Sequence, residues 1–199
     1  MNKEGPAAGD EVLRAFVAVE ITDEVRAALG GLQRELRKSE ARVGWVAPER
    51  IHLTLAFLGD IFAAQVPGLA AALDAAAAGC PPFAFEVAGT GAFGPPHSPR
   101  VVWAGIEEPT GSLARLQAHA AGAVTELGFR LEERPFHPHL TLGRVRGRAG
   151  AADLTSRLES FRSLRCGRVE VRRVLLMQSV LSSQGAEYRV RHSSELKGA

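Results

Sequence analysis

The hydrophobic positions of this chain follow two periods, one typical of helices and one typical of strands, which alternate along most of its length. Four segments carry apolar residues at helical spacing or are rich in Ala and Leu, and we expect each to be a helix. These segments are Asp23–Lys38, Gln65–Ala78, Leu113–Leu127 and Asp153–Phe161. Thr22 is placed to cap the first helix, and Gly128 to end the third.

Short apolar runs and runs of alternating residues predict the strands. They are Leu13–Ile21, Val43–Val46, Ile51–Leu58, Phe83–Val87, Val101–Ile106, a segment from Pro138, Arg168–Leu181 and Tyr188–His192. Gly59 and Asp60 should end the third strand, Thr90–Arg100 should form a loop, and residues 1–10 and 194–199 should be flexible tails. Strands interrupted by single helices indicate an α+β fold with mainly antiparallel sheets.

Two of the predicted strands share a four-residue pattern. His52-Leu53-Thr54-Leu55 recurs as His139-Leu140-Thr141-Leu142. A shuffled chain of this composition would contain His-x-Thr-Leu only about 0.02 times, so two copies are hard to explain as accident. Because side chains alternate across a strand, each copy sends His and Thr to one face and two Leu to the other. We expect the Leu faces to be core and the His/Thr faces to meet in one cleft.

The repeat extends from the pattern to the units around it. A His-Leu-Thr-Leu strand, a helix and an alternating strand follow one another in Ile51–Val87 and again in Pro138–Val174. The chain contains no linker long enough to separate two independent domains. We therefore predict one domain over residues 1–199, with two pseudo-symmetric lobes, sheets flanked by helices, and a central cleft that carries both motif strands.

Two imidazoles facing one phosphate can divide the work of general acid–base catalysis. An unperturbed imidazole has a pKa near 6.5, so a neutral His can accept a proton from water while a protonated one donates to the leaving oxygen. The Thr hydroxyls can donate to phosphate oxygens. Such chemistry needs no metal or cofactor, and Asp60 is the only nearby carboxylate that could serve as a ligand. His137 and His139 are a conceivable metal pair, but Pro138 between them favours a loop histidine.

Composition adds modest constraints on class and location. The formal net charge of +2 and the pI of about 8.8 are compatible with an anionic ligand. Cys80 and Cys166 alone cannot build a disulfide framework or a four-ligand zinc site. No segment has the length and hydrophobicity of an export signal or a membrane span. We expect a cytoplasmic monomer that does not bind membranes.

At these residues the chain resembles the two-histidine (2H) phosphoesterase superfamily, and within it the bacterial RNA 2′,3′-cyclic phosphodiesterases, also called 2′-5′ RNA ligases. The likeness covers roughly Leu13 to Tyr188. Beyond the two motifs it rests on segments 44–48, 57–59, 91–94, 101–103 and 135–144. The resemblance implies a bilobal α+β fold and the opening of RNA 2′,3′-cyclic phosphate ends to 2′-phosphates, with reversible 2′-5′ joining in some members.

The same resemblance assigns roles to individual residues. His52 would be the proton donor, His139 the proton acceptor, and Thr54 and Thr141 would bind the phosphate. Arg144 would also bind phosphate, yet strict alternation places it on the Leu face unless the strand bulges or ends near Gly143. Phe93, a large apolar residue in a Gly/Pro-rich segment, is a candidate for stacking on a base.

Two other functions compete with this interpretation. One is a cyclic phosphodiesterase or ligase acting on a small molecule, which the length of the ligand would distinguish. The other is an RNA-end binding module without turnover, and the intact His in both motifs argues against it. His97, His119 and His192 receive no functional role, and Gly89-x-Gly91-x-x-Gly94 lacks the helix that a dinucleotide site requires.

Overall fold

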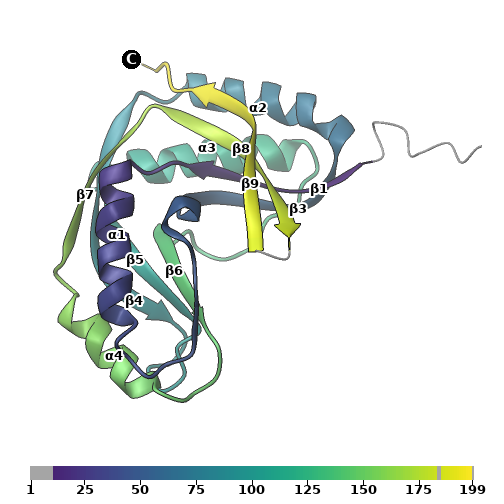
Figure 1. The fold of residues 1–199 in the computed structure, drawn as a ribbon. Coiled ribbons are helices and arrows are strands. Elements are labelled where there is room, and N and C mark those ends of the chain that lie inside the picture. Colours follow the sequence, from purple (N-terminus) through teal and green to yellow (C-terminus); the bar gives the residue numbers. More distant parts are fainter. Residues whose placement is uncertain (1–10, 183–184, 199) are drawn as a thin grey trace, which may run out of the picture.

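The computed structural model describes residues 11–182 and 185–198, and within them the chain is built of helices and one curved sheet (Figure 1). The helices are α1 (Asp23–Leu36), α2 (Val66–Ala78), α3 (Ser112–Glu126) and α4 (Ala151–Ser160), with 3₁₀ turns η1 (Pro48–Arg50) and η2 (Ala63–Gln65). The strands are β1 (Val12–Val19), β2 (Val43–Trp45), β3 (Leu53–Phe62), β4 (Phe83–Phe93), β5 (Val101–Glu107), β6 (His139–Val145), β7 (Arg165–Val171), β8 (Arg173–Ser182) and β9 (Gly185–Glu195). The predicted α+β class is confirmed.

The strand order divides the sheet into two matching halves. It is β7-β4-β5-β6-β3-β1-β8-β9, with β2 added beside β6, and the paired strands are antiparallel. The halves meet where β3 pairs with β6, at Leu53 opposite Leu140. We call the half with β3, β1, β8 and β9 the upper lobe and the half with β6, β5, β4, β7 and β2 the lower lobe, after their positions in Figure 1.

The helices tie the two lobes together. Helices α2 and α3 pack on each other and on the upper lobe, whereas α1 and α4 pack on the lower lobe (Figure 1). Helix α1 nevertheless follows β1 of the upper lobe, and α3 follows β5 of the lower lobe. The chain therefore crosses repeatedly between the lobes.

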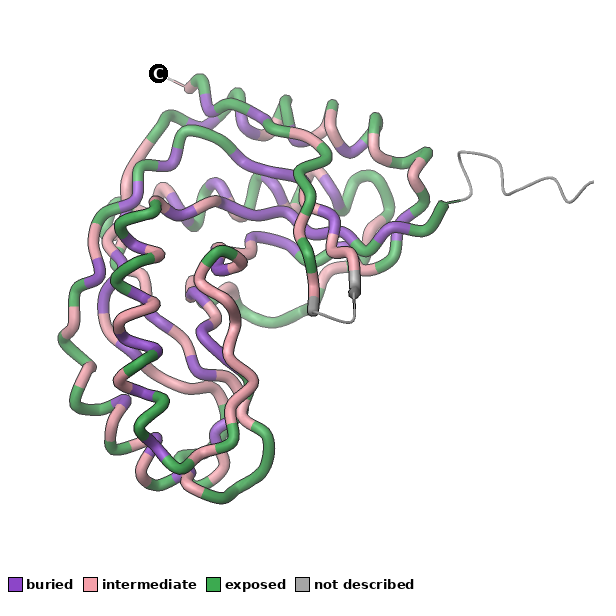
Figure 2. Tube along the Cα trace, viewed as in Figure 1, coloured by how far each residue is buried: buried purple, intermediate pink, exposed green. Residues whose placement is uncertain are grey.

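The Leu faces of both motif strands belong to the hydrophobic core. Leu53, Leu55, Leu140 and Leu142 are each at most 4% exposed. They join one cluster that includes residues of all four helices, and Figure 2 shows buried positions recurring along the strands. Burying a leucine side chain is worth roughly 1.5–3 kcal/mol, so the alternation fixes which face of each strand points away from water.

A bulge near the end of each motif changes which face of the sheet the following side chains occupy. In the β1–β3 ladder, Ala18 pairs with Thr54 and Val17 with Ala56, so Leu55 is an extra residue. In the β5–β6 ladder, Trp103 pairs with Thr141 and Val102 with Gly143, so Leu142 is extra. Each bulge follows the Thr of its motif and reverses the alternation beyond it.

Several predicted boundaries are wrong because strand pairing overrides local turn signals. Strand β3 continues past Gly59, which adopts φ 73° beside a second bulge, and ends at Phe62. Strand β4 includes the Thr90–Phe93 part of the predicted loop, where it pairs with β5. The long strand region expected at Arg168–Leu181 belongs to two strands, β7 and β8, which lie toward opposite ends of the strand order.

The C-terminal segment is also more ordered than its polar sequence suggested. Strand β9 reaches Glu195, and Ser194 and Leu196 are 1% and 6% exposed. The backbone N–H of Leu196 donates to the carbonyl of Arg172 at 2.8 Å, and that of Gly198 donates to Cys80 at 3.0 Å. The expectation of a flexible tail is therefore wrong for residues 194–198, while residues 1–10 and 199 lie outside the described ranges.

Candidate active site

The two motifs meet at the boundary between the lobes. Because β3 and β6 are antiparallel, the pairing of Leu53 with Leu140 sets His52 level with Thr141 and Thr54 level with His139. All four polar side chains line one cavity of about 390 Å³. The structure thus brings together the residues that the repeat singled out, two from each lobe.

His52 is held by a backbone carbonyl and two aromatic rings. Its Nδ1 lies 2.8 Å from the carbonyl oxygen of Arg50, and a carbonyl can only accept, so Nδ1 carries a proton in the neutral ring. Nε2 is therefore the nitrogen that gains and loses a proton. The ring stacks on Phe16, with centroids 4.7 Å apart, and meets the edge of Tyr188 at 5.0 Å.

His139 repeats this arrangement with different neighbours. Its Nδ1 lies 2.7 Å from the carbonyl oxygen of His137, again two residues upstream. Its ring contacts Phe93 edge-on, with centroids 4.8 Å apart. The same anchoring of Nδ1 in both motifs leaves both Nε2 atoms as the exchanging nitrogens.

Both imidazoles are biased toward the neutral form. Burial lowers the pKa of His52, the Arg50 carbonyl opposes that shift, and the positive charge of Arg26 lowers the pKa further. Burial likewise lowers the pKa of His139, the His137 carbonyl opposes it, and the charges of His137 and Arg144 add to the lowering. An anion in the cavity would reverse the bias, because it favours the charged imidazolium.

The bulge at Leu142 decides where Arg144 lies. Without it, Arg144 would share the face of Leu140; with it, Arg144 lines the same cavity as His139 and Thr141. The alternation of residues along the sequence does not predict this reversal, because the extra residue is defined only by the pairing with β5.

The corresponding position in the first motif is Phe57, five residues after His52 as Arg144 is five after His139. Phe57 is 45% exposed, and the guanidinium carbon of Arg14 lies 4.9 Å from the centre of its ring. Arg14 and Phe57 both line the 390 Å³ cavity. The upper lobe therefore supplies a cation from β1 where its own motif has an aromatic ring.

A second, more apolar cavity of about 680 Å³ adjoins the first and shares Thr54, Phe57 and His139 with it. Phe93 and Phe136 line this cavity together with Leu131. Phe93 sits at the end of β4, not within a loop, and packs on Trp103 and His139. It is half-buried, so it both supports His139 and presents apolar surface to the cavity.

The remaining histidines do not join this site as a group. In the described ranges, no cluster of three or more His, Cys, Asp or Glu side chains is placed to hold a metal ion. His137 lies at the second cavity, where its carbonyl anchors His139. No helix among residues 11–182 and 185–198 has both the length and the apolar character to cross a membrane.

Sequence reasoning missed several residues of the cavity wall. They are Arg14, Phe16, Arg50, Phe57, Ser179 and Tyr188. Arg14 carried a usable signal, since it is a lone charge inside an apolar strand. Ser179 and Tyr188 carried none, because β8 and β9 reach the cavity only through sheet pairing.

Comparison with known proteins points to one family. The sequence model of the LigT-like phosphoesterases matches residues 19–103 and 105–188. A protein of Archaeoglobus fulgidus named RNA 2′,3′-cyclic phosphodiesterase is 37% identical over 180 residues, covering 89% of this chain and 97% of that protein. One of the same name from Aeropyrum pernix is 35% identical over 178 residues, covering 86% and 97%.

Solved structures agree with this similarity. The crystal structure of TT0787 from Thermus thermophilus matches with a TM-score of 0.78 and 30% identity, covering 94% of this chain and 99% of that one. Escherichia coli LigT, crystallised with 3′-AMP, matches with a TM-score of 0.73 and 25% identity, covering 94% and 99%.

Proposed function

The chain belongs to the LigT-like phosphoesterase family, and from this premise we propose that it hydrolyses RNA 2′,3′-cyclic phosphate ends to 2′-phosphates by two-histidine acid–base catalysis. One observation carries the proposal. Two His/Thr pairs from opposite lobes line a single cavity, and each His is anchored through Nδ1 so that Nε2 exchanges the proton. Relatives named RNA 2′,3′-cyclic phosphodiesterase match this chain over nearly their whole length, and this similarity supports the choice of substrate.

The reaction places the two histidines on opposite sides of the phosphorus. His139 Nε2 takes a proton from water as the water oxygen attacks phosphorus, and His52 Nε2 gives a proton to the departing 3′ oxygen. The P–O3′ bond breaks and the phosphate stays on the 2′ oxygen. Attacking and leaving oxygens lie roughly in line in such displacements, which suits a base and an acid contributed by two paired strands.

Thr54, Thr141 and Arg144 bind the phosphate in this proposal. Each Thr is level with the opposite His. Its hydroxyl can therefore donate to a non-bridging oxygen, while the imidazoles act on the attacking oxygen and the leaving oxygen. Arg144 lines the same cavity and offers a forked pair of donors. These charge-assisted bonds compensate the negative charge on the phosphate.

The nucleoside occupies the apolar cavity beside His139. Phe93 lines this cavity, and an aromatic face there would stack a base without selecting its identity. In the 2′-5′ joining reaction, the 5′-hydroxyl of a second RNA takes the place of water and attacks the cyclic phosphate. The same two proton transfers serve it, from the 5′-hydroxyl to His139 and from His52 to the departing 3′ oxygen, and they run in the opposite direction when the 2′-5′ linkage is broken.

The decisive experiment incubates the purified protein, in excess EDTA, with a nucleoside 2′,3′-cyclic phosphate and with an oligonucleotide bearing the same end. We expect release of the 2′-phosphate isomer, identified by ³¹P NMR, and a loss of about 10²–10⁴-fold in kcat/KM for His52→Ala or His139→Ala. Faster turnover of the mononucleotide would favour a small-molecule substrate. Binding without turnover, or folded His variants with normal turnover, would contradict the proposal.

A further inference from the structure

Helix α1 carries two polar side chains, Arg26 and Gln33, that point into the structure from its packed side. They are seven residues apart, two helical turns, and therefore share one face of the helix. Gln33 is 2% exposed and Arg26 is half-buried. Neither touches the 390 Å³ cavity, yet both bond to segments that carry its residues.

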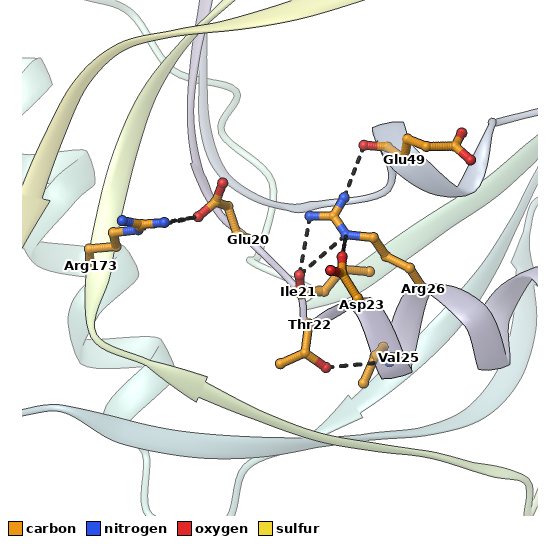
Figure 3. A network of polar contacts seen from close by, with 8 residues as sticks. All are labelled: Glu20, Ile21, Thr22, Asp23, Val25, Arg26, Glu49 and Arg173. Carbon is orange, nitrogen blue, oxygen red and sulfur yellow. Dashed lines mark hydrogen bonds and ion pairs between the residues drawn. The ribbon is translucent and has the colours of Figure 1, made fainter.

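Arg26 joins helix α1 to the turn that precedes His52 (Figure 3). Its Nη1 donates to the carbonyl of Glu49 at 3.0 Å, and its Nε and Nη2 donate to the carbonyl of Ile21 at 3.3 and 3.1 Å. An ion pair of 3.6 Å with Asp23 holds the guanidinium from the exposed side. Glu49 lies in η1 next to Arg50, whose carbonyl anchors His52 Nδ1, so Arg26 fixes the turn on which the His52 tautomer depends.

Gln33 joins the same helix to the second motif. Its Nε2 donates to the carbonyl of Val46 at 2.7 Å and to that of Leu142 at 2.9 Å, which uses both amide hydrogens. The backbone N–H of Val46 donates to the same Leu142 carbonyl at 2.9 Å. Leu142 is the extra residue of the β6 bulge, so Gln33 holds the backbone that turns Arg144 toward the cavity.

We propose that Arg26 and Gln33 are positioning residues of the active site, which hold the turn before His52 and the bulge before Arg144 from one face of helix α1. Each acts on a different motif, and through them one helix sets the geometry of both. The inference rests on the proposed function only for its kinetic consequences. The bonds themselves predict a separate effect on each motif.

Arg26 also acts on the pKa of His52 through its charge, an effect that packing alone would not produce. The ring of His52 faces Phe16 of β1 and Tyr188 of β9, and its cavity is also lined by Arg14, Arg50, Arg144 and His139. Burial is the main cause of the lowered pKa of His52, and the positive charge of Arg26, which lies outside the cavity, lowers this pKa further. Removing that charge should raise this pKa, whereas Lys at the same position should preserve the charge without the fork of three donors.

The first arm of the test compares Arg26→Gln and Arg26→Lys with the control Arg34→Gln, an exposed position on the same helix. Ring NMR signals, with that of His52 assigned by its absence in His52→Asn, report the pKa directly. We expect a higher His52 pKa in Arg26→Gln only, and a kcat about 10-fold lower in both Arg26 variants with KM within a factor of about two. An unchanged pKa in Arg26→Gln, or an unchanged kcat in both variants, would overturn the role of Arg26.

The second arm examines Gln33→Met, which keeps the shape and removes the donors, with Gln33→Asn as a shorter amide in case the first variant does not fold. We expect the affinity for a nucleoside 2′-phosphate to fall by about 10-fold in the wild-type background and by much less in Arg144→Ala. The His52 pKa should stay unchanged. Equal losses in both backgrounds would mean that Gln33 does not act through Arg144. Both arms have binding or NMR readouts, so a failure of the proposed reaction would not be confused with a failure of this inference.

Discussion

Each imidazole of the site is oriented by the carbonyl two residues before it, and this bond has chemical consequences. Arg50 and His137 provide these carbonyls, at 2.8 and 2.7 Å from Nδ1. A fixed Nδ1–H leaves one nitrogen for proton transfer, so neither ring has to change tautomer during the proposed reaction. The two rings still differ in their surroundings, since His52 rests on Phe16 and Tyr188 while His139 rests on Phe93.

The lowered pKa values predict an acidic optimum for the free enzyme. The base must be neutral, so kcat/KM falls as pH drops below the pKa of the base; the acid must be protonated, so kcat/KM falls as pH rises above the pKa of the acid. Burial lowers both values, so both limbs of the bell should lie below the ordinary imidazole value of about 6.5.

A bound phosphate stabilises both imidazolium ions, so the limbs of kcat should lie at higher pH than those of kcat/KM. Steady-state kinetics from about pH 4 to 9 measures both profiles. An optimum of kcat/KM clearly above the imidazole value would contradict the expected direction. The bell alone does not assign the two roles, because exchanging acid and base gives the same curve.

The leaving group assigns them. A proton donor matters most when the departing oxygen is strongly basic, as in ribose, and little when an aryl oxide leaves. We expect His52→Ala to lose about 10²–10⁴-fold on the cyclic phosphate and much less on an aryl phosphodiester, while His139→Ala loses similarly on both. Rate constants for the two substrates with both variants provide the measurement. The reverse pattern would exchange the roles of His52 and His139.

At this scale the sequence predicted the residues that repeat and missed those that depend on contacts. The doubled pattern singled out His52, Thr54, His139 and Thr141, and the structure places these four side chains at one cavity. Gln33 has the sequence signature of an ordinary helical residue, and only the fold places the Leu142 carbonyl, 109 positions away, beside its amide.

At the scale of elements, helices were predicted closely and strands less so. Helix α2 begins one residue after the predicted Gln65, and α3 runs from Ser112 to Glu126 against a predicted Leu113–Leu127, because amphipathic spacing is a local property. The division of Arg168–Leu181 into β7 and β8 was not predictable in this way. No Gly or Pro marks a turn between Arg168 and Leu181, and only pairing with β4 on one side and β1 on the other separates the two strands.

The bulge in β6 yields a prediction of its own. Gly143 follows the extra residue Leu142, and a Cβ there would lie 2.6 Å from Val43 Cγ1 and 3.1 Å from Trp45 Cε3. Gly143→Ala should force β2 away from β6, lower the free energy of unfolding by about 1–3 kcal/mol and weaken phosphate binding through Arg144. Denaturant unfolding and binding of a nucleoside 2′-phosphate measure the two effects.

Gly122→Ala is the matched control for this substitution. Gly122 lies in α3, and a Cβ there meets no atom within 4 Å. Helix propensity favours Ala over Gly by about 0.5–1 kcal/mol, so this variant should be slightly more stable and bind normally. If Gly143→Ala behaved like Gly122→Ala, the close packing of β2 on the bulge would not matter for the site.

For the whole molecule, the two lobes are joined in a way that the repeat alone did not suggest. A tandem repeat predicts two similar units, and the strand order has this symmetry about the Leu53–Leu140 pair. The helices break the simple picture, since α1 leaves the upper lobe to pack on the lower one and α3 does the reverse. Each lobe therefore relies on chain that comes from the other.

This crossing predicts that the lobes unfold as one unit. The core cluster contains Leu29 of α1, Leu73 of α2, Leu116 of α3 and Leu154 of α4, so neither lobe can lose its helices without opening the one core that both lobes share. We expect a single denaturant transition, with a slope that reflects the surface of the whole chain.

Hydrogen exchange at increasing denaturant should show the amides of α1 and α3 losing protection together. Loss of turnover should coincide with that transition, because the proposed site takes one His/Thr pair from each lobe. Earlier loss of protection in α1 and α4 than in α2 and α3 would instead define two units that fold separately, with the active site as their interface.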